Sequence, residues 1–451
     1  MSNIEVIAIL VSSIALLLFM VLKLKIHAFL ALLVASVFLG LMTGMSMESV
    51  VNSISDGMGS TLGFVATVVG IGAIFGQILE SSGSAESLAN YLINRFGKEK
   101  APFALSLTGF IIAIPVFFDI GFIIMVPMLY ALAKSTGKSL LYFAIPLLAG
   151  LAVAHAFVPP TPGPVATAEI IGADLGWVML LGLITGIPVT FIAGPVFGKY
   201  ISKKIHIDVS QTFGTPDDKV IKDLPSFWQV TSIIAVPMVL IIANTVSDVW
   251  ANTHGIDNVF WVKLLGFIGH PFIALLIATF LAIYFMGIKR GFTGDFIMKI
   301  SGKALAPAGL IILVTGAGGV FKQMLVDSGI GVQLAESMSQ SAMPPVVLAY
   351  VLALLIRVSQ GSATVAMITS AGIISPLLIS FALSEPQKAL IVLAIAAGAT
   401  TASHVNDSGF WLVGKYLGLN EKQTLQSWTI METIISVTGF SLALLLSFIF
   451  A

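Results

Sequence analysis

The sequence contains one glycine-rich stretch with a related copy earlier in the chain. The later copy is Gly309-Leu-Ile-Ile-Leu-Val-Thr-Gly-Ala-Gly-Gly-Val-Phe-Lys-Gln-Met-Leu-Val-Asp-Ser-Gly329. The earlier one is Gly63-Phe-Val-Ala-Thr-Val-Val-Gly-Ile-Gly-Ala-Ile-Phe-Gly-Gln-Ile-Leu-Glu-Ser-Ser-Gly83. Aligned without a gap, residues 63–89 and 309–335 are identical at 11 of 27 positions. Glycine, leucine and alanine inflate such matches, but the shared Phe-x-Gln-x-Leu spacing is harder to obtain by chance. The two stretches indicate an internal repeat.

The composition is that of a membrane protein. Of 451 residues, 57% are hydrophobic and 10% are charged, and the mean hydropathy is +1.03. A soluble domain carries about 25% charged residues, and a disordered chain needs low hydrophobicity, so both classes are excluded. The net charge is zero, which argues against nucleic acid as a partner. The absence of cysteine excludes disulfides, thiolate metal sites and cysteine catalysis.

Apolar runs long enough to span a bilayer recur along the whole chain. We expect an all-α polytopic membrane protein with roughly 11–14 transmembrane segments. The runs at 120–133 and 344–357 are short, so each is expected to be a half-span or one arm of a re-entrant hairpin. Placing the first loop in the cytoplasm puts 19 of the 22 basic residues on that side, among them Arg357. The favoured role of Arg357 is a cytoplasmic anchor, and the alternative is that it steers or pairs with an anion.

This orientation makes the two repeats inverted, since 61–80 then runs inward and 304–325 runs outward. Inverted repeats are typical of secondary transporters. The predicted division is N-terminal spans at 1–60, a first repeat half at 61–197, a cytoplasmic linker at 198–227, linking spans at 228–303 and a second repeat half at 304–451.

Substrate sites in such proteins lie where spans are broken, because the N-terminus of a half-helix offers N–H groups and a positive dipole end to an anion. The first half contains two candidate breaks. Residues 115–121 include Asp119, the only acid in the apolar run 101–133 and therefore a functional candidate. Residues 155–164 carry four prolines, which no helix can continue. The plain alternatives are an interhelical turn, a surface loop and, for His155, a core histidine.

The second half contains two polar breaks. Residues 359–364 read Ser-Gln-Gly-Ser-Ala-Thr, and residues 400–409 read Thr-Thr-Ala-Ser-His-Val-Asn-Asp-Ser-Gly. Such groups can bind a polyhydroxylated carboxylate, and His404 and Asp407 could exchange a proton. The alternatives are hydroxyls bonded back to their own helix and an ordinary turn.

These breaks give a predicted site between the two halves. The predicted substrate-binding residues are Thr161, Gly163, Ser359, Gln360, Gly361, Ser362, Thr364, Asn406 and Ser408. The predicted proton-coupling residues are Asp119, His155, His404 and Asp407. The sequence predicts no enzyme, no cofactor and no metal site, because the six histidines are scattered and no nucleophile motif occurs. Residues 135–139 imitate the end of a phosphate loop, but Leu132 stands where the first glycine is required.

At these residues the chain resembles the gluconate:proton symporter (gluconate permease) family. The matching segments are 158–164, 316–329, 361–366 and 404–411, and the resemblance runs from Lys23 to the last span. It implies proton-coupled uptake of gluconate or a related sugar acid across a bacterial inner membrane, as a multi-pass protein. Family members more often carry His where this chain has Thr161, so the resemblance leaves the substrate open among gluconate, other aldonates, hexuronate-like acids and D-serine.

Several other functions stay open on the sequence. A symporter of D-serine or another small carboxylate and a sodium-coupled organic-anion carrier could use the same breaks. A channel-like anion facilitator and an ATP-driven pump with a partner subunit are further alternatives. A membrane enzyme has the least support, and a homo-oligomer is neither indicated nor excluded.

Overall fold

The computed structural model describes residues 3–207, 224–254, 259–329, 344–378 and 381–450. Every regular element in these ranges is a helix, which confirms the predicted all-α class. Eight helical segments in them are long and apolar enough to cross a membrane: Met47–Ser81, Phe118–Thr136, Leu141–Ile171, Leu175–Lys204, Phe227–His254, Pro271–Arg290, Gly294–Asp327 and Glu421–Ile449. Shorter apolar helices are Ala8–Val21, Ala28–Met42, Ala101–Ala113, Pro345–Gln360 and Ala363–Leu378.

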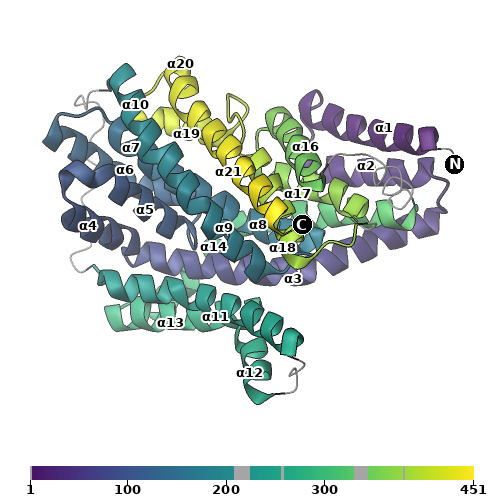
Figure 1. Cartoon of the computed structure of the whole chain (residues 1–451), viewed down its shortest axis with the longest axis horizontal. Helices are drawn as coiled ribbons and strands as arrows, with labels where there is room; N and C mark the ends of the chain where they lie inside the picture. Colours follow the sequence, from purple (N-terminus) through teal and green to yellow (C-terminus); the bar gives the residue numbers. More distant parts are fainter. Residues whose placement is uncertain (1–2, 208–223, 255–258, 330–343, 379–380, 451) are drawn as a thin grey trace.

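The elements fall into two series along the chain (Figure 1). The first series is α1 (Asn3–Leu22), α2 (Ala28–Met42), α3 (Met47–Ser81), α4 (Ser84–Phe96), α5 (Ala101–Ala113), α6 (Phe118–Thr136), α7 (Leu141–Phe157), α8 (Pro162–Ile171), α9 (Leu175–Phe191) and α10 (Phe197–Lys204). The second series is α11 (Phe227–His254), α12 (Phe260–Ile268), α13 (Pro271–Ala282), α14 (Gly294–Asp327), α16 (Pro345–Gln360), α17 (Ala363–Ile374), α18 (Glu385–Ala399), α19 (Ser408–Leu417), α20 (Glu421–Thr424) and α21 (Ile430–Ile449).

The two series correspond further than the sequence alignment showed. Helix α2 begins after His27, whose Nδ1 accepts from the backbone N–H of Phe29 at 3.2 Å. Helix α13 begins in the same way, with His270 Nδ1 accepting from the N–H of Phe272 at 3.4 Å. The short helices also match in order, since α5 to α8 in the first series correspond to α16 to α19 in the second. The repeat therefore includes the helix that precedes each copy of the glycine-rich stretch.

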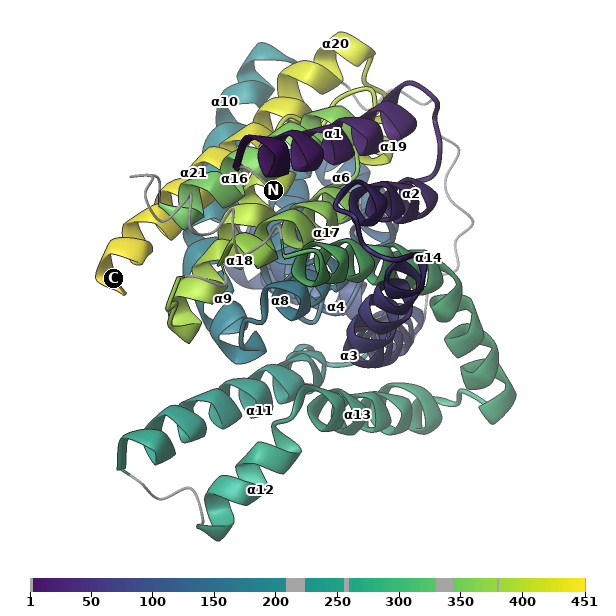
Figure 2. The ribbon, with the colours of Figure 1, turned by 90° about the vertical axis from the view of Figure 1, so that its right-hand side faces the viewer.

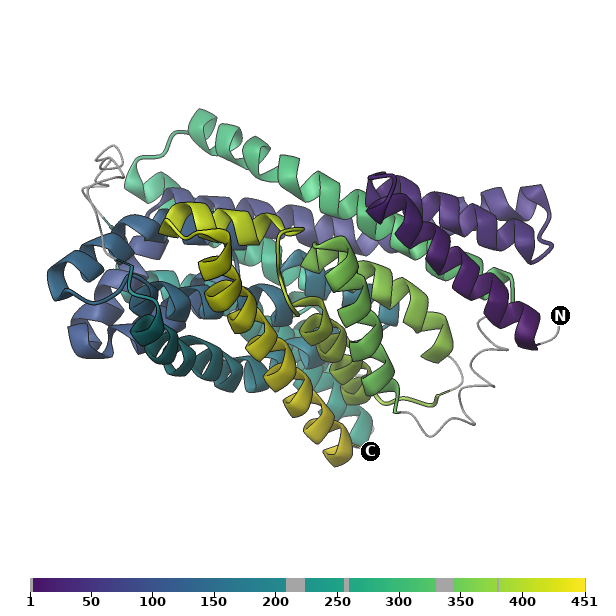
Figure 3. The same cartoon turned by 90° about the horizontal axis from the view of Figure 1, so that it is seen from above.

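Helices α3 and α14, which carry the repeated stretch, pack against each other in opposite directions. Ser53 donates to Asp327 Oδ2 at 2.6 Å, whereas a Cβ at Gly319 would overlap the side chain of Thr61. Residue numbers that increase along α3 therefore meet residue numbers that decrease along α14. The two helices are antiparallel, as corresponding helices of inverted repeats are. The two helices lie side by side along the long axis of the molecule (Figures 2 and 3).

Helices α11, α12 and α13 form a separate layer beside α3 (Figures 1 and 2). Phe64 of α3 and Phe272 of α13 join this layer to the body, with ring centroids 5.2 Å apart. Trp250 and Trp261 at the far end of the layer are exposed. Tryptophan at such positions is typical of the membrane interface.

The predicted spans 61–80 and 304–325 are parts of the longer helices α3 and α14. Helix α3 begins at Met47, where Ser46 caps it, and α14 begins at Gly294, where Thr293 caps it. Their first turns are polar, so apolar runs alone start too late. The predicted boundaries after 60 and 303 therefore fall inside helices, and the helix that crosses position 198 continues to Lys204. The middle of the predicted linker, and Leu334 and Ala335 of the repeat, lie outside the described residues.

Candidate functional site

The four predicted breaks all lie between helices, and each is followed by the first turn of a new helix. Residues 114–117 separate α5 from α6, and residues 158–161 separate α7 from α8. Gly361 and Ser362 separate α16 from α17, and residues 400–407 separate α18 from α19. Each break therefore creates a helix N-terminus inside the protein, where the first backbone N–H groups have no intrahelical partner.

Three of these N-termini face one cavity of about 460 Å³. The first turns of α6, α17 and α19 contribute residues 117–120, 362–365 and 407–409 to its wall. The middle of α14, from Pro307 to Val314, forms another side. The cavity thus lies between the two halves, with three positive dipole ends directed at it, an arrangement that favours an anion.

The only guanidinium among the described residues lining this cavity is Arg357, in the last turn of α16. Its side chain is buried, and Nη2 lies 2.6 Å from Asp407 Oδ2 while Nη1 donates to the Gly361 carbonyl. The predicted role of Arg357 as a cytoplasmic anchor is therefore wrong. Helix α16 ends at an internal break rather than at the membrane surface, and charge counting along the sequence cannot separate these two kinds of helix end.

Asp407 organises the break between α18 and α19. Its carboxylate accepts from Arg357, from the Ser403 hydroxyl at 2.5 Å and from the Gly409 N–H at 3.0 Å, and it caps α19. One of these three donors is charged, and hydrogen bonds between ionised groups are stronger than neutral ones. The carboxylate is thereby fixed in the wall of the cavity.

The two breaks of the second half are tied to each other. His404 Nε2 lies 3.2 Å from the Val358 carbonyl oxygen, to which Asn406 Nδ2 also donates at 2.9 Å. Gly361 has φ +83°, and a Cβ on it would overlap the carbonyl oxygen of Asn406. Glycine is thus required here for both its conformation and its size.

Two residues of the site were missed in the sequence. Glu432 on α21 is 3% exposed and lines the cavity, and its Oε1 has no hydrogen-bond partner among the described residues. Trp428 lines it too, donates from Nε1 to Ser403 at 2.6 Å and lies 5.4 Å from the Phe118 ring, centroid to centroid. Glu432 carried the same signal as Asp119, because it is the only acid in the predicted span 428–450.

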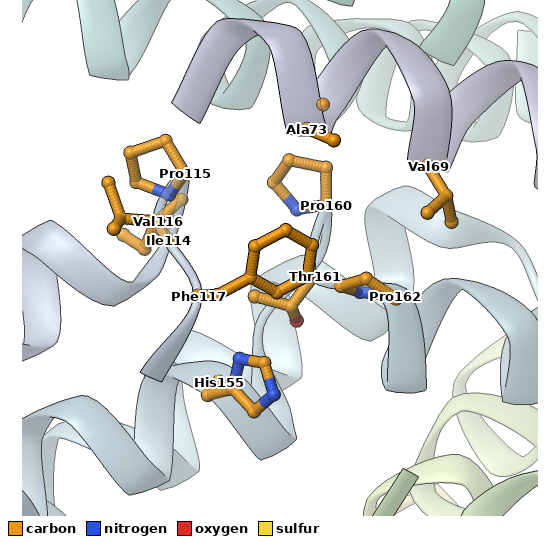
Figure 4. A pocket seen from close by; sticks show the side chains of 11 residues that line it. Val69, Ala73, Ile114, Pro115, Val116, Phe117, His155, Pro160, Thr161 and Pro162 are labelled. Atoms are coloured by element: carbon orange, nitrogen blue, oxygen red, sulfur yellow. The ribbon is translucent and has the colours of Figure 1, made fainter. Parts of the chain in front are cut away.

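The first half contributes Asp119 and His155 to the cavity. Asp119 is exposed in the first turn of α6, whereas the buried Nδ1 of His155 has no partner in the described part of the chain. His155 and Phe117 also line a much smaller pocket with Thr161, shown in Figure 4. The Thr161 hydroxyl donates to the carbonyl of Val158 at 2.6 Å, within its own break.

The structure thus brings only part of the predicted set together. Asp119, His155, Ser362, Thr364, Asp407 and Ser408 line the large cavity. Thr161, Gly163, Ser359, Gln360, Gly361, His404 and Asn406 are absent from the described residues of that lining. Gly163 packs against Met367, and the Ser359 hydroxyl bonds back to Leu355 of its own helix.

A model of the family described as "GntP family permease" matches residues 4–449. The chain belongs to the GntP permease family. It is therefore a multi-pass membrane permease rather than an enzyme, and its family accounts for the membrane-spanning helices described above.

The relatives of this GntP permease match nearly end to end. The "Low-affinity gluconate transporter" of Escherichia coli (strain K12) is 42% identical over 429 residues, covering 95% of each chain. The "Gluconate permease" of Pseudomonas aeruginosa is 40% identical over 437 residues, covering 95% of this chain and 94% of the relative. The "Gnt-II system L-idonate transporter" of E. coli is 37% identical over 431 residues, covering 96% of each.

Two solved transporter structures share the fold of this GntP permease. The Alcanivorax borkumensis YdaH transporter superposes with a TM-score of 0.62 at 14% identity, covering 89% of each chain. Neisseria gonorrhoeae MtrF superposes with a TM-score of 0.63 at 13% identity, covering 90% of this chain and 86% of MtrF. At these identities the likeness concerns the architecture alone.

Proposed function

We propose that this permease imports gluconate or a related sugar-acid anion together with protons, by alternating access, across a bacterial inner membrane. The observation that carries the proposal is the cavity between the halves, where three helix N-termini and Arg357 meet three carboxyl groups. The family membership and the names of the relatives support a sugar acid as the cargo.

The cavity suits a polyhydroxylated carboxylate. Its volume of about 460 Å³ lies in the roughly 300–1,000 Å³ range of small-molecule pockets. Arg357 Nη1 and Nη2 are engaged by Gly361 and Asp407, but its Nε has no partner among the described residues and its charge favours an anion. The open first turn of α6 adds N–H groups. The hydroxyls of Ser362, Thr364 and Ser408 are placed to meet sugar hydroxyls, while Val314 offers an apolar surface to the carbon chain.

The charges of the lining favour coupling to protons. With Asp119, Asp407 and Glu432 ionised, three negative groups face one positive Arg357. A further anion is disfavoured in that state, and each carboxyl that takes up a proton makes its entry easier. By linkage, bound substrate must favour protonation to the same extent. Protons and the anion are therefore expected to bind and move together.

A second cavity supports alternating access. It has a volume of about 400 Å³ and is lined by Lys322 and Val326 of α14 and by Ser375 after α17. These positions lie further along the same two helices that line the first cavity. Between the two levels, a Cβ at Gly318 would lie 2.6 Å from Ile368 Cγ2, so α14 and α17 pack without a gap.

The contacts at the ends of the half-helices α8 and α19 differ between the repeats. The Ile170 carbonyl at the end of α8 accepts from Lys322 Nζ at 2.6 Å and from Ser375 at 2.7 Å. The Tyr416 carbonyl at the corresponding place in α19 accepts from Tyr130 at 2.9 Å. Exchanging such arrangements between inverted halves is how these carriers open their site to either side.

Labelled gluconate uptake into proteoliposomes tests the proposal. We expect an inward proton gradient to drive accumulation that collapses when a protonophore is added. Gradient-independent equilibration would replace the proposal with a facilitator, and a strict need for sodium would replace the coupling ion. Accumulation of D-serine but not gluconate would refute the proposed cargo.

A further inference from the structure

We infer that Glu432 is the residue that carries the coupled proton, an inference that rests on the proposed proton symport. Asp119, Asp407 and Glu432 are the carboxyl groups among the described residues of the cavity wall. They differ in what surrounds their oxygens, and this difference separates their roles.

Asp407 is engaged by three donors. Arg357, the Ser403 hydroxyl and the Gly409 N–H all donate to it, and it sits at the positive end of α19. Protonation would break the ion pair with Arg357 and weaken the helix cap. Asp407 is thus a fixed counter-ion of the guanidinium rather than a group that exchanges its proton in every cycle.

Asp119 is open to the cavity. It lies exposed in the first turn of α6, in the wall of the cavity. A carboxylate in contact with water on one side exchanges protons with that side whether or not substrate is present. It can steer ions and, like the other carboxyls of the cavity, eases anion entry when protonated, but its open position does not shield a proton that it carries.

Glu432 combines burial with a missing partner. It is 3% exposed on α21, and its Oε1 has no partner in the described residues. Arg357 Nε is likewise buried without a partner there, so one donor and one acceptor stand unsatisfied in the same wall. An unpaired buried carboxylate is costly, and either a proton or a shift toward Arg357 removes the cost.

The groups around Glu432 connect this choice to substrate. Arg357 and Asp407 are the charged groups that act on it electrostatically. Asp119 of α6 and His155 of α7 face the same cavity, and Tyr350 of α16 bonds Ser436 one turn further along α21. When a substrate carboxylate draws on the charge of Arg357, the guanidinium compensates Glu432 less, and Glu432 takes up a proton. When the substrate leaves, Glu432 releases the proton and Arg357 compensates its charge again.

The test compares E432Q, E432D and the wild type in proteoliposomes, by two assays. The first is exchange of labelled for unlabelled gluconate with no proton gradient, and the second is accumulation driven by an inward proton gradient. We expect E432Q to exchange gluconate at a rate that no longer varies with pH, and to lose accumulation. We expect E432D to accumulate again, with a shifted pH profile.

The matched control is E86Q. Glu86 on α4 also has a buried oxygen without a partner among the described residues, but it does not line the large cavity. It should accumulate gluconate with the wild-type pH profile. This control separates loss of a buried acid in general from loss of this one.

Two results would overturn the assignment. One is proton-driven accumulation by E432Q with an unchanged pH profile. The other is loss of both exchange and accumulation in E432Q and E432D at unchanged thermal stability. That result would show that Glu432 is needed to bind substrate rather than to carry the proton. Failure of the wild type itself to accumulate gluconate would instead refute the proposed symport, so the two failures are distinguishable.

Discussion

The two repeat halves build the same helices but begin their half-helices differently. In the first half, Phe117 and Thr161 stand before α6 and α8, and neither side chain caps its helix within the described structure. In the second half, Ser362 and Asp407 stand before α17 and α19, and both side chains accept a first-turn N–H. The first half thus leaves the first-turn N–H groups of α6 and α8 without a side-chain cap. The second half caps those of α17 and α19 and also supplies Arg357, Asp407 and Glu432 to the cavity.

The same division holds at the first break of each half. Pro115 and Gly361 are 246 residues apart, the offset of the repeat. Pro115 packs its carbonyl against α3, where a Cβ at Gly76 would overlap it. Gly361 instead packs against Asn406 of the neighbouring break. At these breaks the first half packs through its backbone, whereas the second half supplies Arg357, Asp407 and Glu432 to the cavity.

The largest effect is expected at Arg357. R357K keeps the charge but loses the planar fork that holds both Asp407 and the Gly361 carbonyl. Disrupting a buried pair costs about 3–5 kcal/mol, so gluconate uptake should fall roughly a hundredfold or more. R95K, at an exposed site in the last turn of α4, is the matched control and should transport normally. Near-normal uptake by R357K would contradict the role assigned to the second half.

The next effect is expected at Gly361. G361A meets both a positive φ and the carbonyl of Asn406, so we expect a lower melting temperature in detergent and little uptake. The control is G418A, whose φ is +66° but whose Cβ would have nothing within 4 Å. It should show only the conformational cost of roughly 1 kcal/mol. Equal losses of melting temperature and uptake in G361A and G418A would mean that the contact between Gly361 and the Asn406 carbonyl is unimportant.

A moderate effect is expected at the contact that holds the end of α8. K322M removes a charged donor from the Ile170 carbonyl, and such bonds contribute roughly 1.5–3 kcal/mol. The observed state should become less populated. A single cysteine at Leu310, in the wall of the large cavity, should then react more slowly with an impermeant thiol reagent.

The corresponding change in the other repeat is Y130F, which removes a neutral donor to Tyr416. Its effect on the same labelling rate should be smaller, since a neutral hydrogen bond contributes about 1 kcal/mol. The chain has no cysteine of its own, so the reporter is unambiguous. A larger change in the labelling rate for Y130F than for K322M would contradict the stronger contact assigned to the end of α8.

The smallest effect is expected at Thr161. Its hydroxyl is bonded to Val158 and faces the small pocket, so T161A should change the KM for gluconate by no more than about twofold. S362A loses both a helix cap and a hydroxyl in the large cavity, and its KM should rise roughly fivefold. A larger KM change in T161A than in S362A would place substrate in the small pocket instead.

The sequence predicted the helical class and the four breaks because glycine, proline and polar clusters interrupt apolar runs visibly. It failed where one-dimensional signals coincide. Arg357 ends a helix at an internal break, but in sequence it looks like a basic residue at a membrane surface. Glu432 was detectable as a lone acid in a span, yet only the folded chain shows that it shares a cavity wall with Arg357. Ser359 and Asn406 are as polar as Ser408, and only packing turns them away.

Gluconate binding and proton uptake are expected to be one event in the cavity wall that contains Arg357 and Glu432. Calorimetric titration of gluconate into the purified permease, repeated in buffers of different ionisation enthalpy, counts the protons taken up per bound anion. We expect uptake of about one proton by the wild type and none by E432Q. Gluconate binding to the wild type without net proton uptake, at every pH examined, would contradict it.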